Sequence, residues 1–463
     1  MKLREVMGEE LRGAVGDIEV ARVDSNSRDC REGSLFFALP GRSTSGDKYI
    51  AEALEAGAVA VVTSAEVGNT CPSLLVATAD MHATLVRASA AIVAHPERST
   101  RLVGVTGTNG KTSVTTIVAG LWRAIGGESA VIGTLTHERT TPPPPELFRE
   151  LAVVRDRAQS DEQPLVALEV SSHALDQGRV DGLQFEVAVF TNLSHDHSDY
   201  HLTTEAYFAA KASLFTPERC QRAVIWTDDP FGARLASMCR VPLVPVGSAL
   251  ASDVRCEIGS TTFTWRGLRV ESQFSGGFNV DNSLLALETV VAVGVSADAA
   301  AAALRQVQPV PGRCEVVSRK GPTVIVDYAH TPDGLERILS DLRALRPGAK
   351  IIVVFGCGGD RDREKRPMMG AVATRFADIT VITSDNPRHE NPESIIDQII
   401  AGVTPNSLWS RASDRRVAIA EALKMAGPND VVVVAGKGHE TTQIVGDDVI
   451  NFDDRAVISE LVK

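Results

Sequence analysis

The sequence predicts an α/β fold of three consecutive domains, and three observations lead to it. Apolar runs of strand length recur along the chain, as at 165–170 and 431–435. Segments with apolar residues at helical spacing lie between these runs, an alternation typical of mostly parallel sheets. Finally, 463 residues exceed the usual size of one domain. We expect domains at residues 1–97, 98–312 and 313–463, the third of them Rossmann-like.

Composition excludes several classes of protein. The formal charge of −12 disfavours nucleic acid as a partner. The longest apolar runs have the length of a strand, so the sequence predicts no membrane span. The first residues, MKLREVMGEELRG, lack the apolar stretch of a signal peptide. Seven cysteines show no paired metal spacing, so we expect reduced thiols and a cytoplasmic location.

The first expected domain alternates strands at 33–41, 58–64 and 74–78 with helices at 47–56 and 81–94. Its sharpest local feature is the segment DSNSRDC, in which Ser27 and Arg28 precede the first of these strands. A serine–arginine pair in a loop can bind an anion. On its own, such a pair is more often structural or solvated.

Residues 101–125 open the second domain with a strand, a glycine turn and an amphipathic helix. Backbone N–H groups and the helix dipole at such a turn favour a phosphate. A strict P-loop has a further glycine where this chain has Val105, so the match is to a variant, TGTNGKT. An ordinary glycine turn is the alternative. Because a lysine and a threonine follow directly, we interpret it as an ATP-binding loop formed by Gly107, Thr108, Asn109, Gly110, Lys111 and Thr112.

Further strands are expected at 130–134, 165–170, 187–193 and 223–229, with ligands at their carboxyl ends. Glu169 closes the second of them. A carboxylate there can bind the Mg²⁺ that the Thr112 hydroxyl and the ATP phosphates also bind. A buried structural ion pair is the alternative for Glu169.

The next strand leads into TNLSHDHSDYH, residues 191–201, in which three histidines lie within seven residues. This segment is called the histidine loop below. Zinc is one interpretation, but no cysteine joins the histidines and their spacing fits no common zinc pattern. With ATP nearby, a second magnesium site that includes His197 is more economical.

Lys211 lies in a predicted helix over 203–215, with aromatic residues one turn before and after it. Apolar surroundings disfavour its charged form, so its pKa should fall. A neutral amine can react with CO2 to give a carbamate, which is a metal ligand. The spacing alone favours the alternative, a lysine that snorkels to solvent.

Next along the chain we expect a hairpin at 261–272 and then a helix that begins near Asn279 and Asn282. These two asparagines either cap the helix or contact the edge of a nucleotide base. Strands of the third domain are expected at 324–326, 351–356, 379–383 and 431–435, with an amphipathic helix over 335–345. Each strand ends in a polar cluster. We therefore expect the clusters at 327–330, 356–367, 385–390 and 436–440 to form one site.

These motifs resemble the Mur ligases of peptidoglycan precursor synthesis, which are ATP-dependent amide-forming enzymes. The matching elements, in the family's order, are TGTNGKT, LEVSSH, TNLSHDHSDYH, AAK, FNVDN, PGR, DYAHTPD, GCGGDRD, DNPR and GKGHE. Within the family, the resemblance is to ligases that extend UDP-N-acetylmuramoyl-L-alanyl-D-glutamate. It implies a UDP-binding first domain, a central ATPase, a C-terminal domain that binds the amino acid, and a monomer.

The resemblance also implies roles for single residues. The catalytic residues would be Lys111, Glu169, His197 and Lys211. The Mg²⁺ ligands would be Thr112, Glu169, His197 and Lys211, the last as its carbamate (N6-carboxylysine). For Lys211, the resemblance therefore reverses the preference for a side chain that snorkels to solvent. Asn282, Arg313 and Asp327 would contact ATP. The UDP-muramoyl dipeptide would contact Ser27, Arg28, Thr140, Thr141, Ser171, Gln177 and Arg179. The incoming amino acid would contact Arg361, Asp385, Asn386, Pro387, Arg388, Gly436 and Glu440.

The DNPR form accompanies meso-diaminopimelate in this family. The second carboxylate of diaminopimelate can pair bidentately with Arg388, whereas lysine offers only an ammonium there. L-Lysine, another diamino acid, or a folylpolyglutamate-synthase-like reaction are the enzymatic alternatives. A non-catalytic ATP-switched regulator and a metal-dependent hydrolase built on the histidine loop are alternatives from other classes. One departure from the family is that DSNSR lacks the aspartate that usually stands directly before Ser-Arg.

The expected chemistry is amide synthesis through an acyl phosphate. The γ-carboxylate of D-glutamate attacks the γ-phosphate of ATP, and the diaminopimelate amine then attacks the acyl carbon and expels phosphate. Lys111 and two magnesium ions neutralise the charge of the transferred phosphoryl group.

Overall fold

The computed structural model describes residues 1–8, 17–41, 45–64, 75–78, 80–159, 162–198 and 200–462. These residues form two compact units. Unit 1 comprises residues 1–104, 127–188 and 213–222, and unit 2 comprises residues 105–126, 189–212 and 223–463. Each unit is described by itself below.

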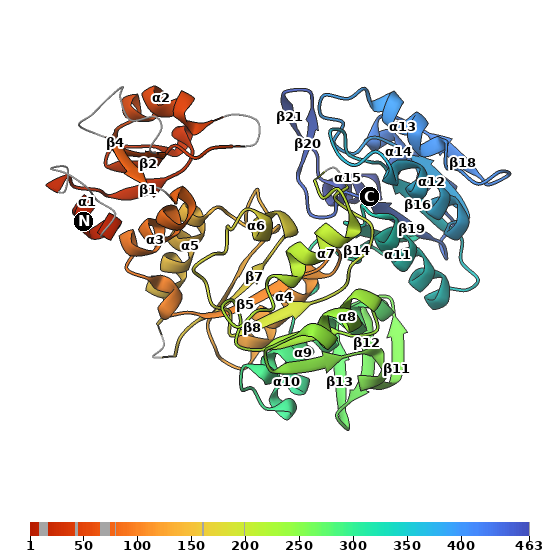
Figure 1. The fold of residues 1–463 in the computed structure, drawn as a ribbon. Coiled ribbons are helices and arrows are strands. Elements are labelled where there is room, and N and C mark those ends of the chain that lie inside the picture. The colour runs from red at the N-terminus through yellow and green to blue at the C-terminus, as the bar shows by residue number, and fades with distance from the viewer. Residues whose placement is uncertain are drawn as a thin grey trace. The chain divides into compact units, whose positions relative to one another are not determined.

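Unit 1 begins with a four-stranded parallel sheet in the order β1-β2-β3-β4 (Figure 1). The strands are β1 (Arg22–Asp24), β2 (Ser34–Phe37), β3 (Ala58–Ser64) and β4 (Leu75–Thr78). Helices α1 (Leu3–Met7) and α3 (Met81–Ile92) pack on one face of the sheet, and α2 (Ile50–Glu55) packs on the other. The strands and helices predicted for residues 33–94 are confirmed, although the first turn of the expected helix 47–56 is a 3₁₀ helix, Gly46–Tyr49.

The remainder of unit 1 supplies two parallel strands, β6 (Ser129–Ile132) and β7 (Leu165–Glu169), with helices α5 (Pro144–Arg157) and α6 (Ser172–Asp176). The central sheet has the strand order β10-β9-β8-β5-β7-β6. In it, β5 (Arg101–Thr106) and β8 (Val187–Phe190) each contribute residues to both units.

Unit 2 contains the helix that follows the glycine turn, α4 (Lys111–Ala124), which packs against α9 (Gly277–Ala292). Its buried face carries Val114, Ile117, Val118 and Leu121, as the helical spacing predicts. The other elements here are β9 (Ala223–Trp226), β10 (Leu243–Val246), α7 (Thr204–Ala212), α8 (Pro230–Met238) and α10 (Ala297–Leu304). The predicted hairpin is confirmed as β12 (Ser260–Trp265) and β13 (Leu268–Ser272), with an unpredicted third strand, β11 (Ala251–Glu257).

The C-terminal part of unit 2 is a six-stranded sheet in the order β14-β15-β19-β16-β17-β18. Its strands are β14 (Glu315–Ser318), β15 (Thr323–Asp327), β16 (Ile351–Phe355), β17 (Ile379–Ile382), β18 (Trp409–Arg411) and β19 (Val431–Ala435). Only β14 pairs antiparallel with its neighbour. The last of these strands along the chain, β19, lies between β15 and β16. The carboxyl ends of the four strands predicted from the sequence therefore lie at one edge.

Helices cover both faces of this C-terminal sheet (Figure 1). Helices α11 (Pro332–Leu345), α12 (Lys365–Phe376) and α13 (Pro392–Ile400) pack against one face, and α14 (Arg415–Met425) and α15 (Asp454–Leu461) against the other. Side chains of β15, β16, β17 and β19 alternate between the two cores, as buried parallel strands require. A hairpin that the sequence did not indicate, β20 (Thr442–Val445) and β21 (Asp448–Asn451), follows β19.

Short 3₁₀ helices lie at Ser27–Asp29, Pro96–Arg98 and Ser248–Leu250. None of the described helices has the length and apolar character that a lipid bilayer crossing requires. The six cysteines in the described ranges are free thiols, as expected.

Candidate functional site

The glycine turn between β5 and α4 has a backbone that only glycine fits. Gly107 has φ +149°, and a Cβ built on it would stand 1.8 Å from the Thr191 hydroxyl oxygen. Gly110 has φ +88°, and its Cβ would stand 2.7 Å from the Asn282 side-chain oxygen. Residues 107–112, called the glycine loop below, therefore lie in close contact with the segment after β8 and with α9.

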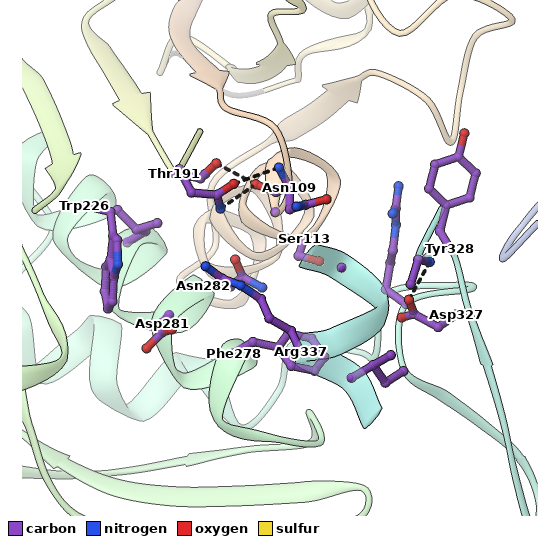
Figure 2. A pocket seen from close by; sticks show the side chains of 17 residues that line it. Asn109, Ser113, Thr191, Trp226, Phe278, Asp281, Asn282, Asp327, Tyr328 and Arg337 are labelled. Carbon is purple, nitrogen blue, oxygen red and sulfur yellow. Dashed lines mark hydrogen bonds between the residues drawn. The ribbon is translucent and has the colours of Figure 1, made fainter. Parts of the chain in front are cut away.

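The first residues of the histidine loop hold the glycine loop in shape. The Thr191 hydroxyl donates to the Asn109 carbonyl at 2.5 Å, and the Asn192 side-chain amide donates to the same oxygen at 3.2 Å (Figure 2). The Asn192 side-chain oxygen in turn accepts the backbone N–H of Asn109 at 3.0 Å. The Ser194 N–H donates to the Thr108 hydroxyl at 3.0 Å. Two motifs far apart in sequence therefore form one structure.

Two lysines converge on one carbonyl of the glycine loop. Lys111 Nζ donates to the Gly107 and Thr108 carbonyls at 2.8 and 2.9 Å, and Lys211 Nζ donates to the Gly107 carbonyl at 2.7 Å. Lys211 is 1% exposed and its ammonium lies 4.6 Å from the centroid of the Tyr207 ring. Burial lowers the pKa of Lys211 well below its usual value, and the charge of Lys111 adds to this effect. The predicted fall of this pKa is confirmed, and the snorkelling alternative is wrong.

His197 adopts φ +58°, and its Nε2 lies 3.4 Å from a carboxylate oxygen of the buried Asp196. The other oxygen of Asp196 lies 3.9 Å from Nζ of Lys365, which belongs to the C-terminal polar clusters. Burial opposes ionisation of Asp196, but the charges of His197, Lys365 and His330 hold its pKa below the usual value. Burial lowers the pKa of His330 to about 4. An ionised carboxylate therefore stands behind the His197 ring, as in many metal-binding histidines.

A cavity opens beside the glycine loop. Its lining combines polar residues of the glycine loop and α9 with the apolar side chains of Trp226, Phe278 and Leu285 (Figure 2). Five residues expected to contact ATP line it: Asn109, Gly110, Asn282, Arg313 and Asp327. The sequence analysis did not identify Asp281, which also lines the cavity and whose pKa burial raises to about 7.

Arg313 connects the C-terminal segment to the glycine loop. Its Nη2 donates to the Thr112 hydroxyl at 2.8 Å, and its guanidinium stacks 4.2 Å from the centroid of the Tyr328 ring. Both oxygens of Asp327 accept backbone N–H groups, from Cys314 at 2.6 Å and Ala329 at 2.7 Å. Burial raises the pKa of Asp327. Asp327 therefore fixes the chain that presents Arg313 and Tyr328.

In unit 1, the residues expected to line a muramoyl-dipeptide channel lie together at the end of β7. The Thr141 hydroxyl donates to the Glu169 carbonyl at 2.7 Å and accepts the Ser171 N–H at 3.1 Å. Arg179 donates from Nη1 to the Thr141 carbonyl at 2.8 Å, and from Nη2 to the Gln177 side-chain oxygen at 2.6 Å. The Thr134 hydroxyl donates to the Thr140 hydroxyl at 3.2 Å, and this contact adds Thr140 to the cluster.

The Glu169 side chain accepts the backbone N–H and the hydroxyl of Thr134, at 3.0 and 3.2 Å. Ser27 and Arg28 occupy the 3₁₀ helix after β1, where Ser27 is buried and Arg28 exposed. Within the described part of unit 1, no hydrogen bond joins these two residues to the cluster around Thr141. The structure therefore does not bring the complete expected set into contact.

Hydrogen bonds join two of the four C-terminal clusters, those at 385–390 and 436–440. The group they form is called the C-terminal pocket below, because we expect it to bind the incoming amino acid. The Asn386 amide donates to the Glu440 carboxylate at 2.8 Å. Lys437, which is 0% exposed, donates to Glu440 at 3.0 Å, to the Thr442 carbonyl at 2.6 Å and to the Asn386 side-chain oxygen at 3.3 Å. The sequence analysis missed Lys437, although its place between two glycines of the GKGHE motif was a usable signal.

Arg388 has φ +50°, and the unpredicted hairpin β20–β21 holds its backbone. Its N–H donates to the Ile444 carbonyl at 3.0 Å, and its carbonyl accepts the Gly446 N–H at 2.7 Å. The side chain donates to the Gly359 carbonyl at 2.8 Å. Partial burial and the charge of Arg361 lower the pKa of Arg388. Among the residues that the structure describes, no carboxylate forms an ion pair with Arg388. Asp385, Pro387 and Gly436 line the same strand ends, where a Cβ on Gly436 would stand 2.6 Å from Asp385 Oδ2.

Comparison with known proteins gives three matching family descriptions: "Mur ligase family, catalytic domain" over residues 19–105, "Mur ligase middle domain" over 105–290, and "Mur ligase, glutamate ligase domain" over 312–438. A curated UDP-N-acetylmuramoyl-L-alanyl-D-glutamate–2,6-diaminopimelate ligase of Thermosynechococcus vestitus is 44% identical, over 94% of this chain and 92% of the relative. The ligase of the same name from Geobacillus kaustophilus is 41% identical, over 97% and 96%. A solved structure with that name matches with a TM-score of 0.66 at 30% identity, over 100% of this chain and 98% of the other.

Proposed function

Because this chain belongs to the Mur ligase family, we infer that it is an ATP-dependent ligase of peptidoglycan precursor synthesis. It joins meso-diaminopimelate to the γ-carboxylate of D-glutamate in UDP-N-acetylmuramoyl-L-alanyl-D-glutamate. The names of full-length relatives at 41–44% identity support this reaction.

The choice of amino acid rests on Arg388, which forms no ion pair with any carboxylate in the described part of the chain. Arg388 is half-buried beside Arg361, and two cations at short range favour a bound carboxylate. Glu440, which accepts a hydrogen bond from Asn386, would offer a carboxylate to an ammonium group. A ligand with a distal carboxylate and a distal amine on one carbon matches both groups. Diaminopimelate has that end, whereas lysine has only the amine.

We propose that the nucleotide binds in the cavity beside the glycine loop, with its phosphates over Lys111 and its base among Trp226, Phe278 and Asn282. Lys111 donates to two loop carbonyls, so its ammonium lies over the loop. There it can neutralise the charge on a transferred phosphoryl group. Arg313, 2.8 Å from the Thr112 hydroxyl, supplies a second positive charge at the same end of the loop.

Thr112, Glu169, His197 and Lys211 would bind magnesium, Lys211 after its amine has added CO2 to give a carbamate and release one proton. The low pKa of the buried Lys211 fits this addition, because only the neutral amine reacts. When bound, magnesium would supply positive charge that stabilises phosphoryl transfer. The ionised Asp196 would hold the His197 ring in position.

In the proposed sequence of steps, the D-glutamate γ-carboxylate attacks the γ-phosphorus, and ADP leaves. Arg388 and Glu440 would hold the distal carboxylate and the distal amine of diaminopimelate. Its other amine then attacks the acyl carbon, loses a proton and expels phosphate. The cluster of Thr140, Thr141, Ser171, Gln177 and Arg179 would hold the muramoyl dipeptide, and Ser27 and Arg28 the uridine diphosphate. We also propose domain boundaries at 97/98 and 312/313, a monomer, and a cytoplasmic location.

A phosphate-release assay with UDP-N-acetylmuramoyl-L-alanyl-D-glutamate and ATP tests the proposal. Meso-diaminopimelate, L-lysine, L-ornithine and L-glutamate would be compared as the second substrate. Of these four amino acids, we expect only meso-diaminopimelate to give phosphate release above background. Equal or faster release with L-lysine would contradict the assignment of Arg388, and release with L-glutamate on a folate acceptor would indicate a folylpolyglutamate synthase. Release that needs neither amino acid nor dipeptide would argue for a simple ATPase.

A further inference from the structure

A cluster of three possible metal ligands lies outside the residues assigned above. The cluster consists of His195, from the histidine loop, and Asp362 and Glu364, from the segment between β16 and α12. One ligand atom of each residue lies within 4.8 Å of the other two. No other group of three such side chains with this spacing occurs in the described ranges. The cluster links two polar segments that are 167 positions apart in the sequence, counted from His195 to Asp362.

The buried member of the cluster has an unsatisfied oxygen. Asp362 is 4% exposed, and its Oδ1 accepts the Glu364 N–H at 2.9 Å. Its Oδ2 is buried and has no hydrogen-bond partner among the residues that the structure describes. A buried carboxylate oxygen without a partner carries a desolvation cost that a ligand would remove.

Nε2 of the His195 ring lies 3.3 Å from this oxygen. The contact is an ion pair by distance only, because the ring N–H is not aimed at the oxygen well enough for a hydrogen bond. Two ligand atoms that share one ion at about 2.1 Å stand about 3.0–3.4 Å apart, depending on the bond angle. The separation and the misalignment therefore both fit two ligands that face a common third point.

A second histidine–carboxylate pair in the same region shows the contrast. His389 Nδ1 and Asp360 Oδ2 form a hydrogen bond of 2.9 Å, and the pair is exposed. This contact raises the pKa of His389 and satisfies both groups. The pair His195–Asp362 has neither the geometry nor the exposure of an ordinary surface ion pair, although the His195 side chain itself is 39% exposed.

We propose that His195, Asp362 and Glu364 bind a divalent transition-metal ion that links the histidine loop to the C-terminal segment. One imidazole and two carboxylates suit Mn²⁺, Fe²⁺ or Zn²⁺ better than Mg²⁺, which prefers oxygen ligands alone. Because two of the ligands are exposed, water completes the coordination. The site does not depend on the proposed ligase reaction, and it is separate from the positions expected to bind magnesium.

Electron paramagnetic resonance of Mn²⁺ added alone, without nucleotide, tests this proposal. The His197→Gln background removes the histidine expected at the magnesium site. In that background we expect one bound Mn²⁺ whose electron-spin-echo modulation shows coupling to an imidazole ¹⁴N. Adding His195→Gln should abolish the coupling, and adding Asp362→Asn should weaken binding more than about tenfold. His389→Gln is the matched control and should change neither quantity.

The experiment measures metal binding and identifies the side chain that binds the metal, so its outcome does not depend on enzymatic activity. If no ¹⁴N coupling appears in the His197→Gln background, or if it survives His195→Gln, the proposal is wrong. His195 is exposed, so its replacement should leave the fold intact, and circular dichroism of each variant checks this. A variant pair with native spectra and unchanged Mn²⁺ affinity would likewise overturn the site.

Discussion

The glycine loop and the C-terminal pocket differ in which protein groups their charged side chains contact. In the glycine loop, two lysines donate to backbone carbonyls, and the loop is held by hydrogen bonds of Thr191 and Asn192 to the backbone of Asn109. In the C-terminal pocket the contacts join side chains: Asn386, Lys437 and Glu440 bond to one another. The first site is built from main chain and the second from convergent side chains.

This difference explains what each site can recognise. A backbone cradle with the ammonium of Lys111 beside it would accept phosphate oxygens of any nucleotide, so its selectivity must come from the adjoining cavity. A set of side chains fixed at several strand ends can match the charges of one particular small molecule. Substitutions in the glycine loop should therefore affect every substrate equally, whereas substitutions in the C-terminal pocket should separate one amino acid from another.

The largest effect is expected for Lys111→Ala. Loss of the ammonium over the glycine loop removes charge stabilisation of the transferred phosphoryl group, for which a kcat reduction of about 10³ is expected. Steady-state phosphate release with each amino acid would measure it. The reduction in kcat should be the same for all amino acids. A reduction confined to diaminopimelate would contradict the proposal that the glycine loop acts on every substrate equally.

The next effect is expected for Arg388→Ala. Removing a half-buried cation that pairs with a substrate carboxylate should lower kcat/KM for meso-diaminopimelate about 100-fold and leave the KM for ATP unchanged. Arg388→Lys keeps the charge but loses the bidentate geometry, so it should recover only part of the activity. If the alanine variant instead raised the KM for ATP, Arg388 would belong with the nucleotide.

A smaller effect is expected from adding one methyl group to the glycine loop. Gly110→Ala places a Cβ 2.7 Å from the Asn282 oxygen at φ +88°, so the KM for ATP should rise about tenfold. Gly126→Ala is the matched control, because that residue has φ +96° with nothing within 4 Å of its Cβ. Both variants share the backbone strain. The difference between their ATP affinities therefore isolates the contact with Asn282, and equal affinities would argue that this contact is unimportant.

The smallest effect is expected for Lys437→Met, which tests the support beneath the C-terminal pocket. Without the buried ammonium, Glu440 and the Thr442 carbonyl lose a donor, at a cost of about 1–3 kcal/mol. We expect a several-fold higher KM for diaminopimelate and a lower melting temperature, with kcat nearly unchanged. Lys424→Met, on an exposed helix end, should change neither quantity. A variant at Lys437 that melts normally would show that Glu440 is held by Asn386 alone.

The parts predicted from the sequence are those with local signals. Strand-length apolar runs predicted β5, β7, β16 and β19 almost to the residue, because fully buried parallel strands have no polar positions. The glycine loop was recognised because a lysine and a threonine follow its last glycine directly. The low pKa of Lys211 followed from its aromatic neighbours one helical turn away.

The parts that were missed depend on contacts between distant segments. Hairpin β20–β21 is exposed and rich in polar residues, so no apolar period marks it, yet it holds the backbone of Arg388. Asp281 resembles any helical aspartate until Asp341 and Asp228 are found near it. Lys437 also reads as a loop lysine, and only its three hydrogen bonds reveal it as a buried support. No one-dimensional pattern contains this information.

The hydrogen bond from Arg313 to the Thr112 hydroxyl has a consequence for how the protein takes up its nucleotide. The guanidinium lies at the oxygen atom that we expect a magnesium ion to approach. Loading would then be an exchange of one cation for another, and Arg313 would be released toward the newly arrived anion. An inhibitor that fills the cavity without displacing this arginine would leave the resting arrangement intact, and its affinity should be insensitive to magnesium concentration.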